Sequence, residues 1–502
     1  MILLLFACAK HDVGVIAAPG HVTILHTNDL HGHFLPEPAE WLENRPAIGG
    51  FERLDAELRA IRAARGDAST LTLDGGDILT GTPLTDIEED GATGTAMLRF
   101  LKLLEYDAWA IGNHEFDKGL DNLSRFSANS AMPLLSANVR SIDGTAPLLP
   151  NQKFAQVFTA GDVKVGVIGV TTEDLGGLMS RADFGRLKLT DVAESVRGEV
   201  ERLDATTDLI VVLSHIGVEH DARLAREVQG IDLIVGGHSH TRMTTAVQVG
   251  ATWIVQSGSY GRSLGVVDLI VSHDGIAEFH YELRDLLPET LPMAPSAEVH
   301  RLAEGYSARI DAVFGEVIAT APALMSRSYY HESALGRWIT DVLVATTGAD
   351  IGLYNGGGLR ADIGPGPVPR RAIFECFPFR NEIMTFTFTG AEVMDLLVRN
   401  AIAESGEKKG FLPISGVRYT WRERNGAAEI VQAYIGGNQV DLAKTYTIAT
   451  NSYIAEQWEK HLGAKPRDLK SFGMSDYDAA LEYAAKHGVH DPGDVRAEKL
   501  GG

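Results

Sequence analysis

Cysteine and basic residues are scarce in this sequence. Its 502 residues contain two cysteines, Cys8 and Cys376, which excludes a disulfide framework. We expect Cys376 to be a small buried apolar side chain. The 45 lysines and arginines are outnumbered by 67 acidic residues, which gives a net charge of −22. This balance argues against nucleic-acid polymers and anionic membrane surfaces as partners. Any anionic ligand would also be repelled at long range, so it would need a local cation to bind.

A long apolar run is missing from the amino terminus. Residues 2–9 are apolar but too few to span a bilayer, and no lysine or arginine precedes them. Leu5-Phe6-Ala7-Cys8 resembles a bacterial lipoprotein cleavage box, with Phe6 an unusual occupant. The start is either a truncated lipoprotein signal or an apolar segment at a misassigned start. We favour the first, because residues 12–20 look like a tether. The expectation is an exported bacterial protein, periplasmic or lipid-anchored.

Length and patterning predict two α/β domains. The chain is too long for one core, and its 45% hydrophobic and 22% charged residues are typical of soluble globular proteins. Apolar strands alternate with helical patterns from residue 22 to about 285, which predicts mostly parallel sheets. Three prolines, Pro288, Pro292 and Pro295, then mark a boundary. We predict an export segment and tether at 1–20, a first domain at 21–288, a linker with a bridging helix at 289–315, and a second domain at 316–502.

Several elements can be placed individually. Helices are expected over residues 51–64, 95–104, 296–313, 332–345 and 391–401 and from residue 476, and strands over 165–170, 253–256, 265–272, 277–284, 351–354, 384–388 and 446–450. The tail beyond the last helix is expected to fray.

Five segments repeat one design, in which a short apolar strand runs into metal-capable side chains. The most concentrated is Gly112-Asn113-His114-Glu115-Phe116-Asp117, which follows the strand 108–111. The other four are His26 to His33, Asp74 to Asp77, Ser214-His215 and Gly236 to His240. Open α/β sheets place their active sites at the carboxyl ends of strands. One such segment would equally suit a helix cap or a turn, but the set of oxygen and imidazole ligands suits two divalent metals that share a carboxylate.

The order D-x-H, G-D, G-N-H-E-x-D, H and G-H-x-H resembles the metallophosphoesterase (calcineurin-like) superfamily. Further on, residues 354–360 (YNGGGLR) and Phe377-Pro378-Phe379 look like the carboxyl-terminal domain of the secreted bacterial and animal 5′-nucleotidases, which include periplasmic UDP-sugar hydrolases. The resemblance covers residues 21 to 460. It implies an α/β (α+β) protein: a metallophosphoesterase β-sandwich flanked by helices, followed by an α/β 5′-nucleotidase-type domain.

The resemblance also implies a ligand set. One metal would be held by Asp29, His31 and His240, the other by Asn113, His215 and His238, with Asp77 as the bridge. Zinc or manganese is expected first, with magnesium, cobalt or iron as alternatives, and the two ions would activate the attacking water. Some family members carry Gln or Asn in place of His240. The neighbouring His26, His33 and Asp74 are expected to be supporting or structural.

His114 is next to a ligand in the motif but is not a ligand by the family pattern. With Asp117 it would form a catalytic dyad, in which the imidazole stabilises charge on the leaving oxygen and the carboxylate keeps it oriented and cationic. The alternative is a structural histidine that is hydrogen-bonded to a turn aspartate.

The substrate residues implied by the resemblance are Asn355, Gly357, Arg360, Phe379 and Tyr453. Asn355 and Arg360 match positions that contact the base and the phosphate or ribose. The glycines let the backbone approach the ligand, and the two aromatic rings would sandwich the base; the alternative is that they are ordinary core aromatics.

Three departures from the family pattern alter this pocket. The stretch 331–336 lacks an expected arginine and asparagine, for which Arg327 or Arg337 could compensate. Arg380 replaces a glycine, and residues 455–458 replace an Asn-Gly-Gly-Asp-Gly run.

The sequence therefore predicts a dimetal 5′-nucleotidase of nucleotide catabolism. Alternatives with the same site are a 2′,3′-cyclic nucleotide phosphodiesterase/3′-nucleotidase and a nucleotide-sugar hydrolase. A thiosulfohydrolase-like enzyme and a non-catalytic surface binding protein are further alternatives. No oligomeric state is indicated.

Overall fold

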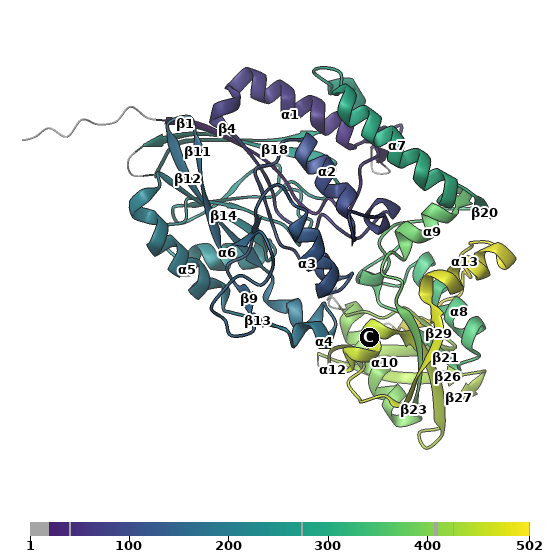
Figure 1. The fold of residues 1–502 in the computed structure, drawn as a ribbon. Coiled ribbons are helices and arrows are strands. Elements are labelled where there is room, and N and C mark those ends of the chain that lie inside the picture. Colours follow the sequence, from purple (N-terminus) through teal and green to yellow (C-terminus); the bar gives the residue numbers. More distant parts are fainter. Residues whose placement is uncertain (1–19, 40–41, 273–274, 406–409, 425, 501–502) are drawn as a thin grey trace, which may run out of the picture. The chain divides into compact units, whose positions relative to one another are not determined.

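The computed structural model describes residues 20–39, 42–272, 275–405, 410–424 and 426–500 (Figure 1). The predicted export signal, with Cys8, lies outside these residues. Contacts divide the chain into two units. One takes in residues up to 30, 34–78 and 98–300, and the other takes in 31–33, 79–97 and the chain from 301 onward. The domain limits expected from the sequence stay predictions.

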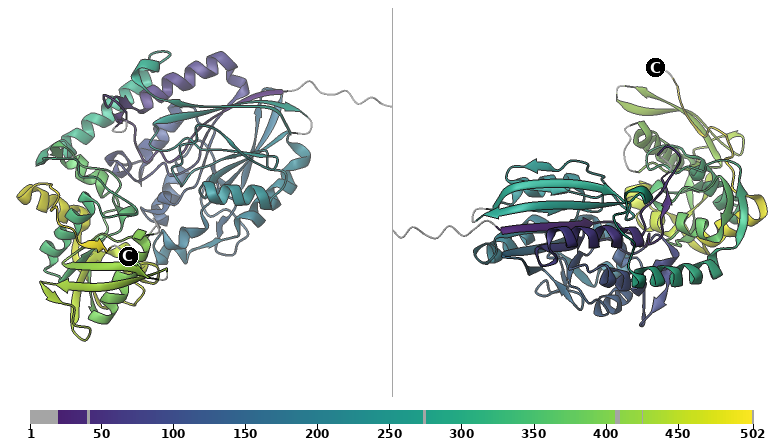
Figure 2. Two further views of the ribbon diagram at one scale, coloured as in Figure 1. Left: turned by 180° about the vertical axis from the view of Figure 1, so that it is seen from behind. Right: turned by 90° about the horizontal axis from the view of Figure 1, so that it is seen from above.

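Two β-sheets form the first unit (Figures 1 and 2). The strands of the first sheet, in spatial order, are β10 (Gln152–Lys153), β8 (Leu134–Leu135), β7 (Ala108–Ala110), β4 (Thr70–Asp74), β1 (Gly20–Thr27), β18 (Ser263–Ser272) and β19 (Gly275–Asp285). Those of the second are β11 (Ala155–Ala160), β12 (Val163–Thr171), β14 (Leu209–His215), β15 (Leu233–Val235), β17 (Thr252–Val255) and β16 (Val247–Val249). Most neighbouring pairs are parallel, with antiparallel strands at the margins, which confirms the predicted pattern.

The core of this unit lies between the sheets. Alternate residues of β1 and β4, among them Ile24 and Leu73, meet alternate residues of β12 and β14, among them Val165 and Leu213. The opposite face of the second sheet is apolar as well, and it is covered by α5 (Val192–Leu203) and α6 (Val218–Glu227). Parallel strands that are buried on both faces read as continuous apolar runs, as β14 does.

Helix α1 (Phe51–Arg65) covers the first sheet, and Arg62 on its inner side donates to Thr72 Oγ1 of β4 across 2.7 Å. Helices α2 (Thr95–Leu103) and α3 (Leu120–Ala128) follow β4 and β7 in the chain. The arrangement is the predicted sandwich with flanking helices.

The second unit contains a five-stranded and a four-stranded sheet. The five-stranded sheet has the order β24 (Ile414–Ser415), β21 (Ile351–Leu353), β28 (Thr445–Asn451), β23 (Glu382–Thr389) and β29 (Arg467–Ser475), and the four-stranded sheet has β27 (Asn438–Gln439), β26 (Ala427–Ile435), β25 (Val417–Arg424) and β30 (Ala497–Lys499). Its main helices are α8 (Ala334–Thr347), α9 (Arg370–Cys376), α10 (Gly390–Ser405) and α13 (Asp476–His487), and α7 (Ala297–Phe314) leads into it. This unit is α/β, as predicted.

Two sequence expectations need correction. The chain does not fray after α13: β30 pairs with β25, and Arg496 beside it is buried, with hydrogen bonds to four carbonyl or side-chain groups in addition to Asp341. Helix α8 begins two residues later than predicted, because Ser333 has an extended backbone and caps the helix by accepting from the N–H of Gly336.

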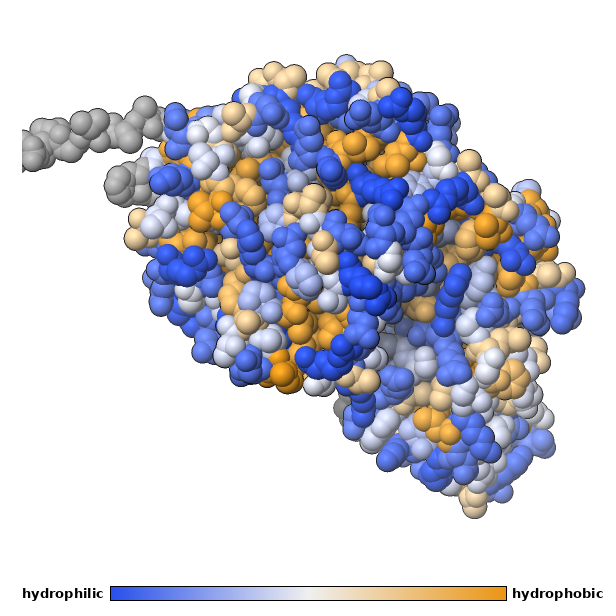
Figure 3. Space-filling view, viewed as in Figure 1, coloured by the Kyte–Doolittle hydropathy of each residue, from blue (hydrophilic) through white to orange (hydrophobic). Residues whose placement is uncertain are grey.

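Other features agree with the sequence. Cys376 is a free thiol buried in the core of the second unit, and burial raises its pKa well above the usual value. In the described part of the chain, no helix has both the length and the apolar character needed to cross a bilayer. Hydrophilic and hydrophobic residues are interspersed on the face drawn in Figure 3.

Candidate metal centre

The metal-capable side chains gather because adjacent parallel strands end at the same edge of their sheets. In the first sheet, β1, β4 and β7 are neighbours and lead to Asp29, Asp77 and Asn113. In the second sheet, β14 and β15 are neighbours; β14 ends at His215, and β15 leads to His238 and His240. The two sheets thus bring six of the predicted ligands to one end of the sandwich.

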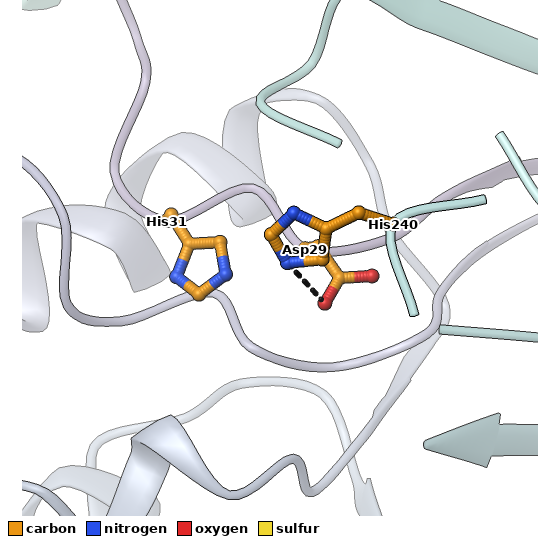
Figure 4. A group of neighbouring side chains, drawn as sticks. All are labelled: Asp29, His31 and His240. Carbon is orange, nitrogen blue, oxygen red and sulfur yellow. Dashed lines mark ion pairs between the residues drawn. The ribbon is translucent and has the colours of Figure 1, made fainter. Parts of the chain in front are cut away.

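Three groups of potential ligand atoms result, and within each group the atoms lie within 4.8 Å of one another. The groups are Asp29, His31 and His240; Asp77, His215 and His238; and His31, Asp77 and His114. In the first group the imidazole of His240 faces the carboxylate of Asp29, and His31 lies beside them (Figure 4). Because Asp77 belongs to two groups, it has the position expected of a shared ligand.

Short polar distances join the same residues. Oδ1 of Asp29 lies 3.2 Å from Nε2 of His240, and Oδ2 of Asp77 lies 3.0 Å from Nε2 of His215. Oδ1 of Asn113 lies 2.8 Å from Nδ1 of His238. The sequence prediction grouped Asn113 with His215 and His238, and the structure brings these side chains together.

The backbone is strained at most of these positions. Five of the seven predicted ligands have a positive φ, between 48° and 72°: Asp29, His31, Asp77, His238 and His240. Residues other than glycine rarely adopt this conformation, which costs about 1–3 kcal/mol at each position. Strain that recurs at one group of residues is typical of a functional site.

Two glycines make the close approach of the loops possible. A Cβ atom at position 112 would lie 2.2 Å from Oδ1 of Asp77, and one at position 76 would lie 2.9 Å from Nδ1 of His215. No side chain fits at either place, which explains why Gly112 and Gly76 stand beside the ligands.

The site attracts positive charge. Burial opposes the ionisation of Asp29, but His240 and His215 together outweigh burial and hold the pKa of that carboxyl below its usual value. Burial likewise opposes charge on His215, and Asp77, Asp29 and the carbonyl of Gly75 together outweigh it, which raises the pKa of His215 to about 10. A pocket that stabilises cations so strongly, with oxygen and imidazole donors together, fits a pair of divalent metal ions.

Two histidines are already oriented for metal binding. Nδ1 of His215 lies 2.7 Å from the carbonyl of Gly75, and Nδ1 of His31 lies 2.7 Å from that of Thr80. A carbonyl accepts only, so each Nδ1 donates its proton there, and Nε2 is the nitrogen that would bind a metal once its own proton is displaced. Nε2 of His215 is buried and faces Oδ2 of Asp77 across 3.0 Å.

The predicted dyad is also assembled. Nδ1 of His114 lies 2.7 Å from Oδ2 of Asp117, and Nε2 of His114 lies 3.9 Å from Oδ2 of Asp77. Asp117 therefore holds the imidazole through Nδ1, and Nε2 points toward the metal-ligand groups around Asp77.

The neighbouring residues expected to be structural lie outside these groups. His26 is fully buried, stacks on Tyr281 with ring centroids 6.0 Å apart, and has its pKa lowered to about 3 by burial. Asp74 accepts from Thr27 Oγ1 and from the N–H of Gly76, and burial raises its pKa to about 7. His33 is half-buried and is in none of the groups.

In the second unit, two predicted substrate residues, Arg360 and Gly357, lie beside Tyr329, a tyrosine that the sequence prediction missed. The guanidinium of Arg360 lies 5.8 Å from the ring of Phe379 and 3.3 Å from the hydroxyl of Tyr329. A Cβ at Gly357 would lie 3.5 Å from the Tyr329 ring, which is ordinary contact, whereas one at Gly356 would lie 2.2 Å from the carbonyl of Ser328. Packing therefore requires Gly356, and also Gly358, where a Cβ would lie 2.9 Å from the ring of Tyr354, but it does not require Gly357. The only signal for Tyr329 was its place two residues before the stretch 331–336, which departs from the family pattern.

The two arginines proposed as substitutes differ. Arg337 is held by the Asp491 carboxylate at 2.8 and 2.6 Å. The guanidinium of Arg327 lies 5.1 Å from the centre of the Tyr329 ring, beside the predicted pocket. Of the two, only Arg327 is shown beside Tyr329, so it stays the better candidate for the compensating arginine.

Tyr453 lies on α11 (Ser452–Glu456), next to Asn451 at the end of β28. Its ring contacts His461 of α12 (Trp458–His461), with centroids 5.4 Å apart. The two short helices occupy the stretch where the family pattern has its glycine-rich run.

Comparison with known proteins identifies the family. Residues 22–242 match the model of the calcineurin-like phosphoesterases, and residues 317–462 match that of the 5′-nucleotidase C-terminal domain. The chain belongs to the 5′-nucleotidase family of calcineurin-like phosphoesterases. This makes it a phosphoesterase, as the sequence predicted.

Three relatives illustrate the range of the family. Protein UshA of Escherichia coli is 28% identical, with 86% of this chain and 85% of the relative covered. The crystal structure of a 5′-nucleotidase precursor from Thermus thermophilus has a TM-score of 0.84 and 28% identity, with 96% of this chain and all of that chain covered. The trifunctional nucleotide phosphoesterase protein YfkN of Bacillus subtilis is 27% identical over 93% of this chain, which spans 34% of YfkN.

Proposed function

We propose that the protein is a dimetal 5′-nucleotidase, which cleaves nucleoside 5′-monophosphates to nucleoside and phosphate. The observation that carries the proposal is the position of Asp77. Its carboxylate lies within 4.8 Å of ligand atoms of His215 and His238 and also of His31 and His114. A carboxylate between two such groups is what a pair of metal ions needs as a bridge.

The proposed ligands are those predicted from the sequence. Asp29, His31 and His240 would hold one ion, and Asn113, His215 and His238 the other. When bound, two divalent ions would activate a water as nucleophile and neutralise the phosphoryl oxygens. Side chains of the protein would supply the remaining step, which is stabilisation of the leaving group.

His114 and Asp117 would act on the leaving group. Asp117 accepts from Nδ1 of His114, which fixes the ring and favours its protonated form. Nε2–H would then stabilise the negative charge that develops on the nucleoside oxygen as the P–O bond breaks, and deliver the proton to it. The proton balance closes, because the attacking water loses the proton that the leaving oxygen gains.

For the base pocket, the structure supports a definite orientation of Asn355. Oδ1 of Asn451 accepts from the backbone N–H of Ile454, so its Nδ2 is the atom that donates to Oδ1 of Asn355 across 2.8 Å. The remaining polar atom of Asn355 is then Nδ2, a donor. We assign it to an acceptor atom of the base, with Arg360 on phosphate or ribose, Gly357 beside them and the rings of Phe379 and Tyr453 as stacking surfaces.

A second candidate function rests on the altered pocket. Helices α11 and α12 replace the family's glycine-rich run, so a larger or cyclic nucleotide remains a candidate substrate for the same centre. This reading is a 2′,3′-cyclic nucleotide phosphodiesterase/3′-nucleotidase or a nucleotide-sugar hydrolase.

Turnover on a matched panel tests these assignments. The panel contains a nucleoside 5′-monophosphate, a 3′-monophosphate, a 2′,3′-cyclic nucleotide, a UDP-sugar and an aryl phosphate, with elemental analysis of the purified protein. We expect two ions per chain, zinc or manganese rather than magnesium, cobalt or iron, and the highest kcat/KM on the 5′-monophosphate. Activity on a thiosulfonate ester alone would support the thiosulfohydrolase alternative, and no hydrolysis with both ions bound would support a binding protein.

We also propose that the protein is exported, periplasmic or anchored through a lipid on Cys8. The support is the sequence Leu5-Phe6-Ala7-Cys8 and the following tether-like stretch. Expression in a bacterium with the native upstream start should give membrane-associated protein, and Cys8→Ser should release or misprocess it. Identical soluble cytoplasmic behaviour of both forms would contradict this localisation.

A further inference from the structure

The buried carboxylate of Glu115 joins the two loops that carry Asp77 and Asn113. Its side chain has no exposed surface. Oε2 accepts from the N–H of Gly112 at 2.7 Å and from that of Asp77 at 3.1 Å, and Oε1 accepts from the N–H of Ile78 at 2.9 Å. Hydrogen bonds to an ionised carboxylate are about twice as strong as neutral ones.

These bonds begin where the sheet ends. Pairing between β4 and β7 stops at Asp74 and Trp109, so the ladder does not hold the loops that follow. In the opposite direction, Oδ1 of Asp77 accepts from the N–H of His114 at 2.8 Å. Each loop thus contributes one carboxylate that accepts from the backbone of the other loop, and these three bonds replace the missing ladder.

The effect falls on the conformation of Asp77. Its φ is +56°, a value that residues with a side chain rarely adopt. Glu115 accepts from the N–H groups of both Asp77 and Ile78, which are the amides on either side of the Asp77 Cα. Both peptide planes that define this conformation are therefore fixed by one side chain, and in this conformation Oδ2 of Asp77 lies 3.0 Å from Nε2 of His215.

We propose that Glu115 is a positioning residue, which holds the Asp77 carboxylate where two divalent ions can share it. This inference rests on the proposed function, because it takes Asp77 as the bridge. Glu115 acts through the backbone of Asp77 and through no contact with substrate. Loss of its carboxylate should weaken metal binding first and turnover only in consequence.

Glu115→Gln in the full chain tests the proposal. Glutamine has nearly the same size, but it offers one acceptor oxygen and turns an NH2 group toward a backbone N–H. Metal-free protein is titrated with Mn²⁺ by calorimetry. The wild type should bind two ions, and the variant should bind Mn²⁺ about 10–100-fold more weakly. Losses of this size are typical when a residue that orients a metal ligand is replaced. Excess Mn²⁺ should restore kcat, with the KM for a nucleoside monophosphate unchanged.

Glu57→Gln is the matched control. Glu57 is 5% exposed, lies in the same unit and faces Arg284 at 3.3 Å. Its replacement removes an equally buried carboxylate, so it should affect thermal stability but not Mn²⁺ affinity. If Glu115→Gln does not fold, Glu115→Asp keeps the charge on a side chain one methylene shorter, and the same Mn²⁺ loss is expected because it cannot reach both loops.

The outcomes separate this proposal from the function. Wild-type Mn²⁺ affinity and stoichiometry in the position-115 variants would overturn the positioning role. A second result would also overturn the positioning role: weak Mn²⁺ binding, a kcat that excess Mn²⁺ does not restore, and a lower Tm of the metal-free variant. Together these would show that Glu115 has a general structural role. A wild-type protein that neither binds two ions nor hydrolyses a nucleotide would instead overturn the proposed function.

Discussion

His114 donates from Nδ1 to Oδ2 of Asp117 across 2.7 Å, and its Nε2 lies 3.9 Å from Oδ2 of Asp77. The imidazole is 14% exposed, enough to meet a substrate while its orientation is fixed from behind. This geometry distinguishes His114 from the predicted ligands and leads to the first prediction.

Replacement of His114 by alanine should lower kcat by roughly 10²–10³-fold, because the lost charge stabilisation acts in the transition state. Metal content should not change. Asp117→Asn should lower kcat by less, since the imidazole remains but is no longer favoured in its protonated form. Steady-state kinetics with elemental analysis measure both. A His114→Ala protein that has lost a metal would show that His114 is a ligand.

Asp77→Asn should reduce both metal content and turnover, because the amide cannot bridge two cations as a carboxylate does. His33→Ala, which changes a half-buried histidine outside the ligand groups, should lose far less activity. His26→Ala should lose stability instead, as its ring is fully buried. Chelation of the wild type should abolish activity, and added Mn²⁺ or Zn²⁺ should restore it. Full activity of metal-replete Asp77→Asn would mean that the ligand assignment is wrong.

Phe379→Ala and Tyr453→Ala should raise the KM for nucleoside monophosphates, each by the equivalent of about 1–3 kcal/mol, through loss of a stacking surface. Neither change should slow the hydrolysis of an aryl phosphate, which has no base. Phe472→Ala is the control, because Phe472 is 41% exposed on β29 of the same unit. Equal losses on both substrates would show that these rings do not form a base pocket.

Asp476 gives a pH dependence of stability in the second unit. Burial raises its pKa to about 7, against hydrogen bonds from the hydroxyl of Tyr354 and the N–H of Tyr477. Because the folded-state pKa exceeds the usual value of 3.8, the folded protein binds more protons than the unfolded chain between these two values. The free energy of unfolding should therefore fall as pH rises through this window, by up to about 1.4 kcal/mol per pH unit.

Thermal unfolding of the wild type and Asp476→Asn between pH 4 and pH 8 measures this effect. The stability of the wild type relative to the variant should decline toward pH 7 and then level off. The control is Asp478→Asn. Asp478 is exposed on the same helix, and its carboxylate accepts a hydrogen bond from the hydroxyl of Ser475. A difference between wild type and Asp476→Asn that does not vary with pH would contradict the assignment.

Arg496→Leu should destabilise the protein by roughly 3–5 kcal/mol, because it leaves buried acceptors and a carboxylate without their cation. The side chain is 4% exposed and donates to Asp341, Asp494, Thr340 and the carbonyls of Arg337 and Ile414. Lys499→Ala, which removes the half-exposed ion pair with Glu423, should change stability by less than about 1 kcal/mol. Chemical denaturation measures both, and equal values would mean that β30 is not held by Arg496.

Much of the site could be predicted because its chemistry is local in the sequence. Each predicted ligand follows an apolar strand by a few residues, and parallel strands bring their carboxyl ends together whatever the details of packing. The spacing of Asn113, His114 and Asp117 within one turn likewise places the dyad on a single short segment. The failures were at contacts that join distant segments. The terminal stretch was expected to fray because its own pattern is polar, and only the buried acceptors around Arg496 explain why it pairs with β25.

The sequence by itself determined the ligand types, their strands and the order of the two domains, since these follow from periodicity and from side-chain chemistry. The tertiary structure decided which hydrogen-bond partners the buried and charged side chains meet. Glu115 stands in the motif beside Asn113, yet its role depends on the N–H groups of Asp77 and Ile78, which are more than thirty residues away in the chain. The position of the Arg337 guanidinium likewise depends on a distant partner, Asp491. A hydrogen bond between remote segments leaves no periodic trace in the sequence, because its energy depends on where the fold places the partner.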